Sequence, residues 1–277
     1  TLPSGKAVVH GVDGLGRVTG VTLDGSPIAS AMSYHPNGAL AGMTYGNGQL
    51  FSQTQTARQL PDRMRSALGS EVPVDLTYSY NPRGQIASIN DQSPANIDQA
   101  FTYDDIGRLT AGTGPWGAST FSYDAIGNLL QRQVGTRTVA LSYNAANRLS
   151  SHTDTAGTAP TPVTGTYAYD GPLRRVKQVV GGLTRYSVYD VSGGLVSIDQ
   201  IGAGPTEYIR ASGMTLARVA GAAVTWLHPD HLGSAVAGTG STRLVGPAWP
   251  MLKEKYLFED TPIGQSTSEN YNDLIAR

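Results

Sequence analysis

The sequence predicts an all-β protein built from an array of antiparallel β-hairpins, and three observations support this class. A nine-residue motif that begins at Phe101 recurs at Phe121 and Leu141, so its tyrosines are 20 residues apart. A fixed period of this kind indicates an array of one supersecondary unit. The 277 residues also include 34 Gly and 16 Pro, and only 15% are charged. That composition suits a turn-rich β protein and suits helices badly.

Each copy of the motif describes one hairpin. In Phe101-Thr-Tyr103, two large apolar residues flank a small one, as in a strand with one buried face. Asp104 then offers an acceptor to the backbone two residues further on, and Gly107 tolerates positive φ. The apolar pattern resumes at Leu109, so the motif predicts a strand, a turn of four to five residues and a second strand.

The repeat extends in both directions from this centre, to about ten copies. Valine replaces tyrosine in the first copy, at Val12-Asp13, and a close pair of copies follows at Tyr34 and Tyr45. We predict that the following motif residues form the strand ends and turns of the array: Tyr34, Gly38, Tyr80, Gly84, Tyr103, Asp104, Gly107, Tyr123, Asp124, Gly127, Tyr143, Asn144, Asn147, Tyr169, Asp170, Tyr189, Asp190 and Gly193.

Two segments interrupt the period. The stretch 52–70 contains Gln, Arg and Met with few β-branched residues, so it fits a polar hairpin extension or a short helix broken by Pro61, and we favour the hairpin. The stretch 153–165 is rich in Thr, Pro, Gly and Ala and is predicted to be a long hairpin loop. Because the period resumes unchanged after it, we treat the array as continuous.

Composition and charge exclude several classes of protein. The formal net charge is −1, so no overall basic field would attract nucleic acid or an anionic bilayer. The chain has no cysteine, which excludes disulfides and thiolate metal sites. It also has no apolar run near the length that a membrane-spanning helix needs.

Three patterns resemble chemical sites, and each has a simpler explanation. His228-Pro-Asp230-His231 offers two imidazoles and a carboxylate, yet proline prevents a helix from aligning them as metal ligands. The pattern Gly-x-Gly-x-x-Gly at 112–117 has a strand and no helix after it, so it predicts a hairpin tip. Adjacent Asp104 and Asp105 fit turn capping better than acid–base catalysis. We therefore expect no catalytic residue, no metal and no cofactor.

The repeated tyrosines allow two interpretations. They could form an aromatic platform for sugars or unfolded polypeptide, because tyrosine combines a large apolar ring with a hydroxyl. Alternatively, they form a packed ladder that supports each turn from within the sheet. We favour the packed ladder.

The motif Tyr-Asp-x-x-Gly-Arg-Leu resembles the YD repeats of the Rhs family, which are shared with bacterial toxin-complex subunits and animal teneurins. Tyr208 to Arg218 is similar to the strand before the family's core, and Tyr256 to Gln265 resembles a segment that follows it. The family's Asp-His-Leu-Gly-Ser signature is matched by Asp230, His231, Leu232, Gly233 and Ser234.

The resemblance implies a sheet that spirals into a hollow shell around a toxin or other polypeptide cargo. It divides the single array 1–277 into repeats over 1–200, a core-like segment over 206–265 and an unassigned tail over 266–277. The family's later segments and its aspartyl self-cleavage region have no match here, so we expect no enzyme and an incomplete shell. That shell would be an open curved sheet, or one closed by another chain or by self-association.

The expected role is thus the structural wall of a shell in a secreted or cell-surface protein of a bacterial toxin system. Its partners would be a polypeptide cargo or the remainder of the shell, with no nucleic acid and no membrane span. The alternative is a cell-surface adhesion or carbohydrate-binding module, which would add glycans to these partners.

Overall fold

The computed structural model describes residues 1–155 and 162–241, and within these ranges it contains strands and turns but no helix. The all-β prediction is confirmed. The strands are β1 (Val8–Val12), β2 (Val18–Leu23), β3 (Ser26–Tyr34), β4 (Leu40–Tyr45), β5 (Leu50–Gln55), β6 (Pro61–Leu68), β7 (Glu71–Tyr80), β8 (Ile86–Asp91), β9 (Gln99–Tyr103), β10 (Leu109–Gly114), β11 (Gly117–Tyr123), β12 (Leu129–Val134), β13 (Arg137–Tyr143), β14 (Leu149–Thr155), β15 (Val163–Tyr169), β16 (Arg175–Val180), β17 (Leu183–Tyr189), β18 (Leu195–Gln200), β19 (Gly204–Ala211), β20 (Met214–Ala220), β21 (Ala223–Pro229) and β22 (Ala235–Thr239).

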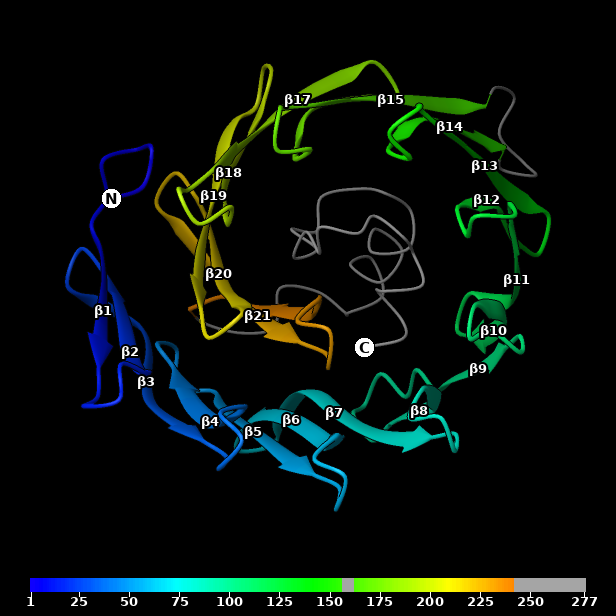
Figure 1. The fold of residues 1–277 in the computed structure, drawn as a ribbon. Helices are drawn as coiled ribbons and strands as arrows, with labels where there is room; N and C mark the ends of the chain where they lie inside the picture. The colour runs from blue at the N-terminus through cyan, green and yellow to red at the C-terminus, as the bar shows by residue number, and fades with distance from the viewer. Residues whose placement is uncertain (156–161, 242–277) are drawn as a thin grey trace.

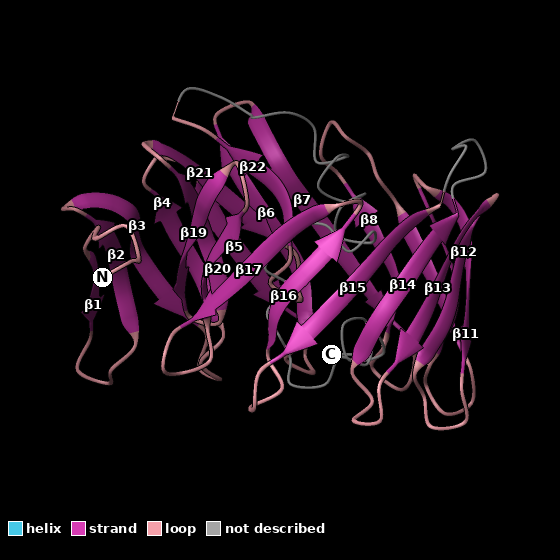
Figure 2. Cartoon of the chain, turned by 90° about the horizontal axis from the view of Figure 1, so that it is seen from above, coloured by secondary structure: helices cyan, strands magenta, loops and turns pink. Residues whose placement is uncertain are grey.

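The strands form one antiparallel meander in which each strand pairs with the next along the chain, from β1–β2 to β21–β22. Successive connections therefore alternate between the two rims of the sheet, which Figure 2 shows on either side of the strands. We call the rim that carries the β1–β2, β3–β4 and later odd-to-even connections the motif rim, because most copies of the motif lie there.

The sheet curves into a ring-shaped wall, and its last strands lie inside its first strands (Figure 1). We call this overlap, β1–β7 outside and β19–β22 inside, the seam. Trp226 Nε1 donates to the carbonyl of Ile28 at 3.0 Å, and the Tyr45 hydroxyl donates to the carbonyl of Leu227 at 2.8 Å. Among the described strands, β1 pairs only with β2 and β22 only with β21, so no backbone ladder closes the sheet, and it is open as predicted.

The main hydrophobic core fills the seam. Both layers contribute large, fully buried side chains, among them Val21, Ile28 and Met64 from the outer layer and Ile209 and Leu216 from the inner layer. Among the described residues, the wall has a single layer between β9 and β18, where Leu129, Val139, Leu141 and Leu149 form a small buried apolar cluster. The ring is therefore closed by side-chain packing at the seam.

The seam also shows which face of the sheet points inward. Tyr78 packs edge-on against His231 of the inner layer, and Tyr80 lies two residues further along the same strand, on the same face. The pairing of successive strands places the other motif tyrosines on the same inward face, where they lie half-buried. The opposite, outer face carries exposed small polar side chains such as Thr120 and Ser122.

Three of the predicted local elements form hairpins in the structure. The stretch 52–70 is the hairpin of β5 and β6, so the helical alternative is wrong, and the glycine-rich 112–117 is the tip of the β10–β11 hairpin. Tyr208 to Arg218 is a β19–β20 hairpin and not one strand, because Ser212 and Gly213 both adopt positive φ and reverse the chain. The centre of the predicted loop 153–165 and the segments Tyr256 to Gln265 and 266–277 lie outside the described residues.

Candidate functional site: the turn and tyrosine ladder

One turn geometry recurs around the wall. The first residue of the turn donates its N–H to the carbonyl four residues later, and the fourth residue donates back to the carbonyl of the first. The fourth residue has positive φ, which is 90° at Gly107 and 56° at Asn147. On the motif rim this bond pair begins at Asp13, His35, Thr56, Asn81, Asp104, Asp124, Asn144, Asp170, Asp190 and Asp230. On the opposite rim it begins at Leu2 and Tyr45.

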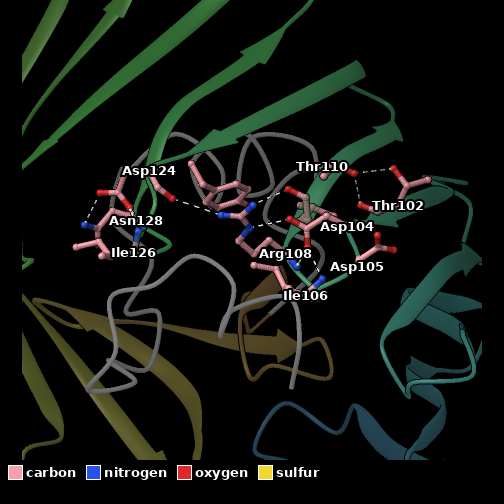
Figure 3. Close-up of polar contacts among 12 residues, drawn as sticks. Thr102, Asp104, Asp105, Ile106, Arg108, Thr110, Asp124, Ile126 and Asn128 are labelled. Carbon is pink, nitrogen blue, oxygen red and sulfur yellow. Dashed lines mark hydrogen bonds and ion pairs between the residues drawn. The ribbon is translucent and has the colours of Figure 1, made fainter.

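The first side chain of the turn caps the backbone, as Figure 3 shows for two adjacent copies. Asp104 Oδ1 accepts the N–H groups of Ile106 at 3.1 Å and Arg108 at 2.8 Å, while Oδ2 accepts Arg108 Nε at 2.7 Å. Asp124 makes the same contacts with Ile126 and Asn128. In these two turns both carboxylate oxygens are therefore occupied by the turn itself.

These carboxylates are stabilised in their charged form. Burial opposes ionisation of Asp104, but the hydrogen bonds and the positive charge of Arg108 outweigh it and hold the pKa of the carboxyl below its ordinary value. The pKa of Asp190 is also lowered, chiefly by the Ser192 hydroxyl. A general acid at neutral pH needs a raised pKa, so this environment favours a structural role for the turn aspartates.

The motif tyrosines connect each hairpin to the one before it. Tyr123 Oη donates to the carbonyl of Leu109, the residue that follows the preceding turn, at 2.8 Å. The same relation, with distances from 2.6 to 2.9 Å, holds at Tyr34, Tyr80, Tyr103, Tyr143, Tyr169 and Tyr189. Because this hydroxyl is used within the wall, the geometry favours the packed ladder over an aromatic platform.

Arginine completes the link between neighbouring hairpins. The Arg108 guanidinium is paired with Asp104 and lies 5.1 Å from the centre of the Tyr123 ring. Arg108 Nη1 also reaches the carbonyl of Asp124 at 3.4 Å. Arg17 over Tyr34 and Arg174 over Tyr189 repeat the stacking. A carboxylate, a guanidinium and a phenol thus form one contact chain across two successive hairpins.

The segment 230–234 is another copy of the same turn. Asp230 Oδ1 accepts the N–H groups of Leu232 at 2.9 Å and Ser234 at 3.0 Å, and Gly233 has a φ of 76°. His231 donates its backbone N–H to the Tyr78 hydroxyl at 3.2 Å, so this turn joins the inner layer of the seam to the outer layer.

His228 lies inside the seam, not in the turn. It is fully buried, its Nε2 is 2.8 Å from Thr239 Oγ1, and its ring packs edge-on against Tyr45. Burial lowers the pKa of His228 to about 3, so the imidazole is neutral at physiological pH. Within 1–155 and 162–241, no group of three or more His, Cys, Asp or Glu side chains is placed to hold a metal ion.

Sequence reasoning missed three features of the ladder. The turn at Thr56 was hidden because Thr replaces Asp and Gln59 takes the glycine position, with a φ of 62°. The turn at Leu2 does not match the motif because its first residue is apolar, and Gly5 is the one motif residue that it retains. At Asp170 the positive φ falls on Leu173, at 65°, and not on the nearby glycine.

Comparison with known proteins identifies similar folds. The model of the Teneurin YD-shell family matches residues 65–201, whereas no curated protein sequence matches the chain. The Photorhabdus luminescens Tc holotoxin pore with a mutated TccC3 has a TM-score of 0.57 at 15% identity, covering 87% of this chain and 16% of that chain. The TcdB2–TccC3 structure has a TM-score of 0.59 at 15% identity, covering 87% and 17%.

A third structure, TcdB2–TccC3 without its hypervariable C-terminal region, has a TM-score of 0.56 at 15% identity, covering 85% of this chain and 16% of that chain. The likeness therefore does not depend on the hypervariable region of that protein. This chain spans about one sixth of the length of the chains it matches. In the part of the chain that the structure describes, no helix is long and apolar enough to cross a membrane.

Proposed function

Because this chain belongs to the Rhs/YD-repeat family, we propose that it forms part of the wall of a β-shell that encloses or presents a polypeptide cargo. The main support for this proposal is the ladder of tyrosines on the inward face, which joins successive hairpins into a ring-shaped wall. A wall fixed in this way separates an inner face from an outer face with different chemistry.

The two faces differ in the way that this role requires. Phe121 and Arg132 lie opposite each other in the register of β11 and β12 and point inward with Tyr123. Tyr167 and Gln178 are similarly paired further along the wall. Arg132 and Gln178 are themselves buried, so the half-buried aromatic rings are the groups that this face offers to an unfolded chain. On β11 the outer face carries the small hydroxyl side chains Thr120 and Ser122.

This proposal assigns the chain a non-catalytic role and a place among secreted or cell-surface proteins of a toxin system. The polypeptide partners would be cargo on the inner face and further shell at the ends of the sheet. The tyrosine hydroxyls are already bonded within the wall, so we propose polypeptide, and not glycan, as the partner of the inner face.

A photo-crosslinking experiment tests the proposal. The crosslinking amino acid p-benzoylphenylalanine would replace Phe121 on the inner face or, as a matched control, the adjacent Thr120 on the outer face. The probe is a permanently unfolded polypeptide, such as reduced and carboxymethylated α-lactalbumin. We expect crosslinks from position 121 and at least fivefold fewer from position 120. Equal labelling, or labelling mainly from position 120, would refute an inward cargo surface.

A further inference from the structure

We propose that the open edge of β1, together with the outer face of β17 and β18, is a docking surface for a further β-hairpin of a YD-repeat wall. The inference rests on the proposed shell role and specifies one of its partners. Three features of the molecule support it: the unpaired edge of β1, the order in which strands overlap in the seam, and the side chains exposed where the overlap ends.

The edge of β1 lacks the usual protection. Among the described strands β1 pairs only with β2, and its sequence Val-Val-His-Gly-Val contains neither proline nor a charged residue. Val9 and Val12 are both 59% exposed. Proteins normally shield such edges with charges, proline or covering segments, because an open edge is a template for another strand.

The seam has a definite order of overlap. His10 of β1 lies over β19, where its Nε2 is 3.0 Å from the carbonyl of Arg210, and β3 lies over β21 through Ile28 and Trp226. At the far end, β7 lies over β22. The two layers thus run in the same order, and next to β1 two strands of the outer layer span two strands of the inner layer. A strand added to β1 would cover β18, and a second strand would cover β17.

At that position the outer face carries two large exposed side chains beside the charged residues Lys177 and Asp199. Tyr186 and Val188 of β17 point outward and are 41% and 43% exposed. Elsewhere in the described strands, large exposed apolar side chains away from strand ends are limited to Val9 of β1 and Leu130 of β12. Tyr186 and Val188 therefore add exposed apolar area beyond the last strand that β1 covers, with Lys177 and Asp199 at its border.

The occupant that fits is a hairpin resembling β3–β4. That hairpin already forms the outer layer of the seam, and it turns Ile28, Met32, Leu40 and Met43 toward the core. An additional hairpin with the same alternation would extend the β1 ladder by backbone bonds and bury Tyr186 and Val188 under its apolar face. The surface thus accepts a piece of further shell, in continuity with the established packing of the seam.

A peptide-binding experiment tests this surface on the full chain. The probe is a dye-labelled synthetic peptide with the sequence of residues 26–45, and its binding is measured by fluorescence anisotropy. We expect saturable binding that Val188→Lys and Val9→Lys each weaken at least tenfold. Thr120→Lys, on the outer face far from β1, should leave the affinity unchanged. A peptide with lysine at both methionines should not bind.

Three results would overturn the proposal: no binding of the peptide to the unmodified chain, equal binding by the Val188→Lys and Thr120→Lys variants, or a dimer in sedimentation equilibrium that Val9→Lys dissociates. The last would make a second copy of this chain the occupant. Val188→Lys leaves the inner face unaltered, so crosslinking from position 121 should persist in that variant. Failure of the docking surface is therefore distinguishable from failure of the cargo proposal.

Discussion

Tyrosine contributes to this wall through one hydroxyl bond as well as through its ring. Each motif tyrosine donates to a carbonyl just past the preceding turn, so each bond crosses from one hairpin to the previous one. Since the acceptor is a main-chain carbonyl, phenylalanine would preserve the ring packing but leave a carbonyl with one partner fewer.

We therefore expect Tyr123→Phe to lower the free energy of unfolding by about 0.5–1.5 kcal/mol. Urea denaturation followed by circular dichroism measures the change. The control is Tyr186→Phe, at an exposed position on the outer face, which should be close to neutral. A loss at Tyr186 as large as that at Tyr123 would contradict the role of the hydroxyl bond.

Leu173 occupies a backbone conformation that costs free energy. Its φ is 65°, at the turn position where most copies have glycine, and its side chain is 41% exposed. An L-residue with a bulky side chain loses about 1–2 kcal/mol in this region, partly offset by the greater chain entropy of an unfolded glycine. We expect Leu173→Gly to stabilise the chain by about 0.5–1 kcal/mol in the same denaturation assay.

The reverse change provides the matched test. Gly127 has a φ of 96° in the equivalent position of another turn, so Gly127→Val should destabilise by roughly 1–3 kcal/mol. If Leu173→Gly destabilised the chain or Gly127→Val were neutral, positive φ would not be the determinant of this turn.

At the scale of the hairpin, the sequence indicates much of the architecture but not its closure. The 20-residue period, with Asp104 and Gly107 at fixed places, predicts the strand–turn–strand unit because turn chemistry is local. The turn at Thr56 escapes prediction because backbone bonds can form the same turn without Asp or Gly. The pairing of Trp226 with Ile28 escapes it because no short-range pattern encodes a contact 198 residues apart.

The seam should respond to acid through His228. Burial lowers the pKa of His228 to about 3, while a histidine in the unfolded chain titrates near 6.5. Between these values the unfolded chain binds a proton that the folded chain does not. The stability that the neutral His228 contributes is therefore complete above pH 6.5. It falls as the pH drops toward 3, by at most about 1.4 kcal/mol per pH unit.

We expect His228→Gln to flatten the decline in unfolding free energy between pH 6.5 and pH 4, measured by urea denaturation at several pH values. His10→Gln, at an exposed residue of β1, should retain the decline of the unmodified chain. An unchanged slope in the His228 variant would show that the buried imidazole does not govern the acid response of the seam.

The whole ring has two regions of different packing. The seam has two layers and the larger hydrophobic core, whereas β9–β18 form one layer with a small apolar cluster. Local stability follows buried apolar contact, so the two regions should open with different free energies.

Hydrogen exchange followed by mass spectrometry should detect this difference. We expect the amides of β3–β5 and β20–β21 to exchange at least tenfold more slowly than those of β11–β16 under native conditions. Every strand in both sets pairs with a strand on each side, so the two sets do not differ in backbone pairing. Uniform protection around the ring would mean that the ladder alone, without the second layer, sets local stability.

Closure by overlap also affects how such a wall can evolve. In a closed barrel, strand number, tilt and stagger must agree, so adding strands alters the whole geometry. Here no ladder bond joins the first described strand to the last, and the two ends meet through side chains on facing layers. Duplication of one hairpin adds about 10 Å of circumference, at two strand spacings, and only shifts where the ends overlap. Circumference can thus change one repeat at a time while the wall remains closed.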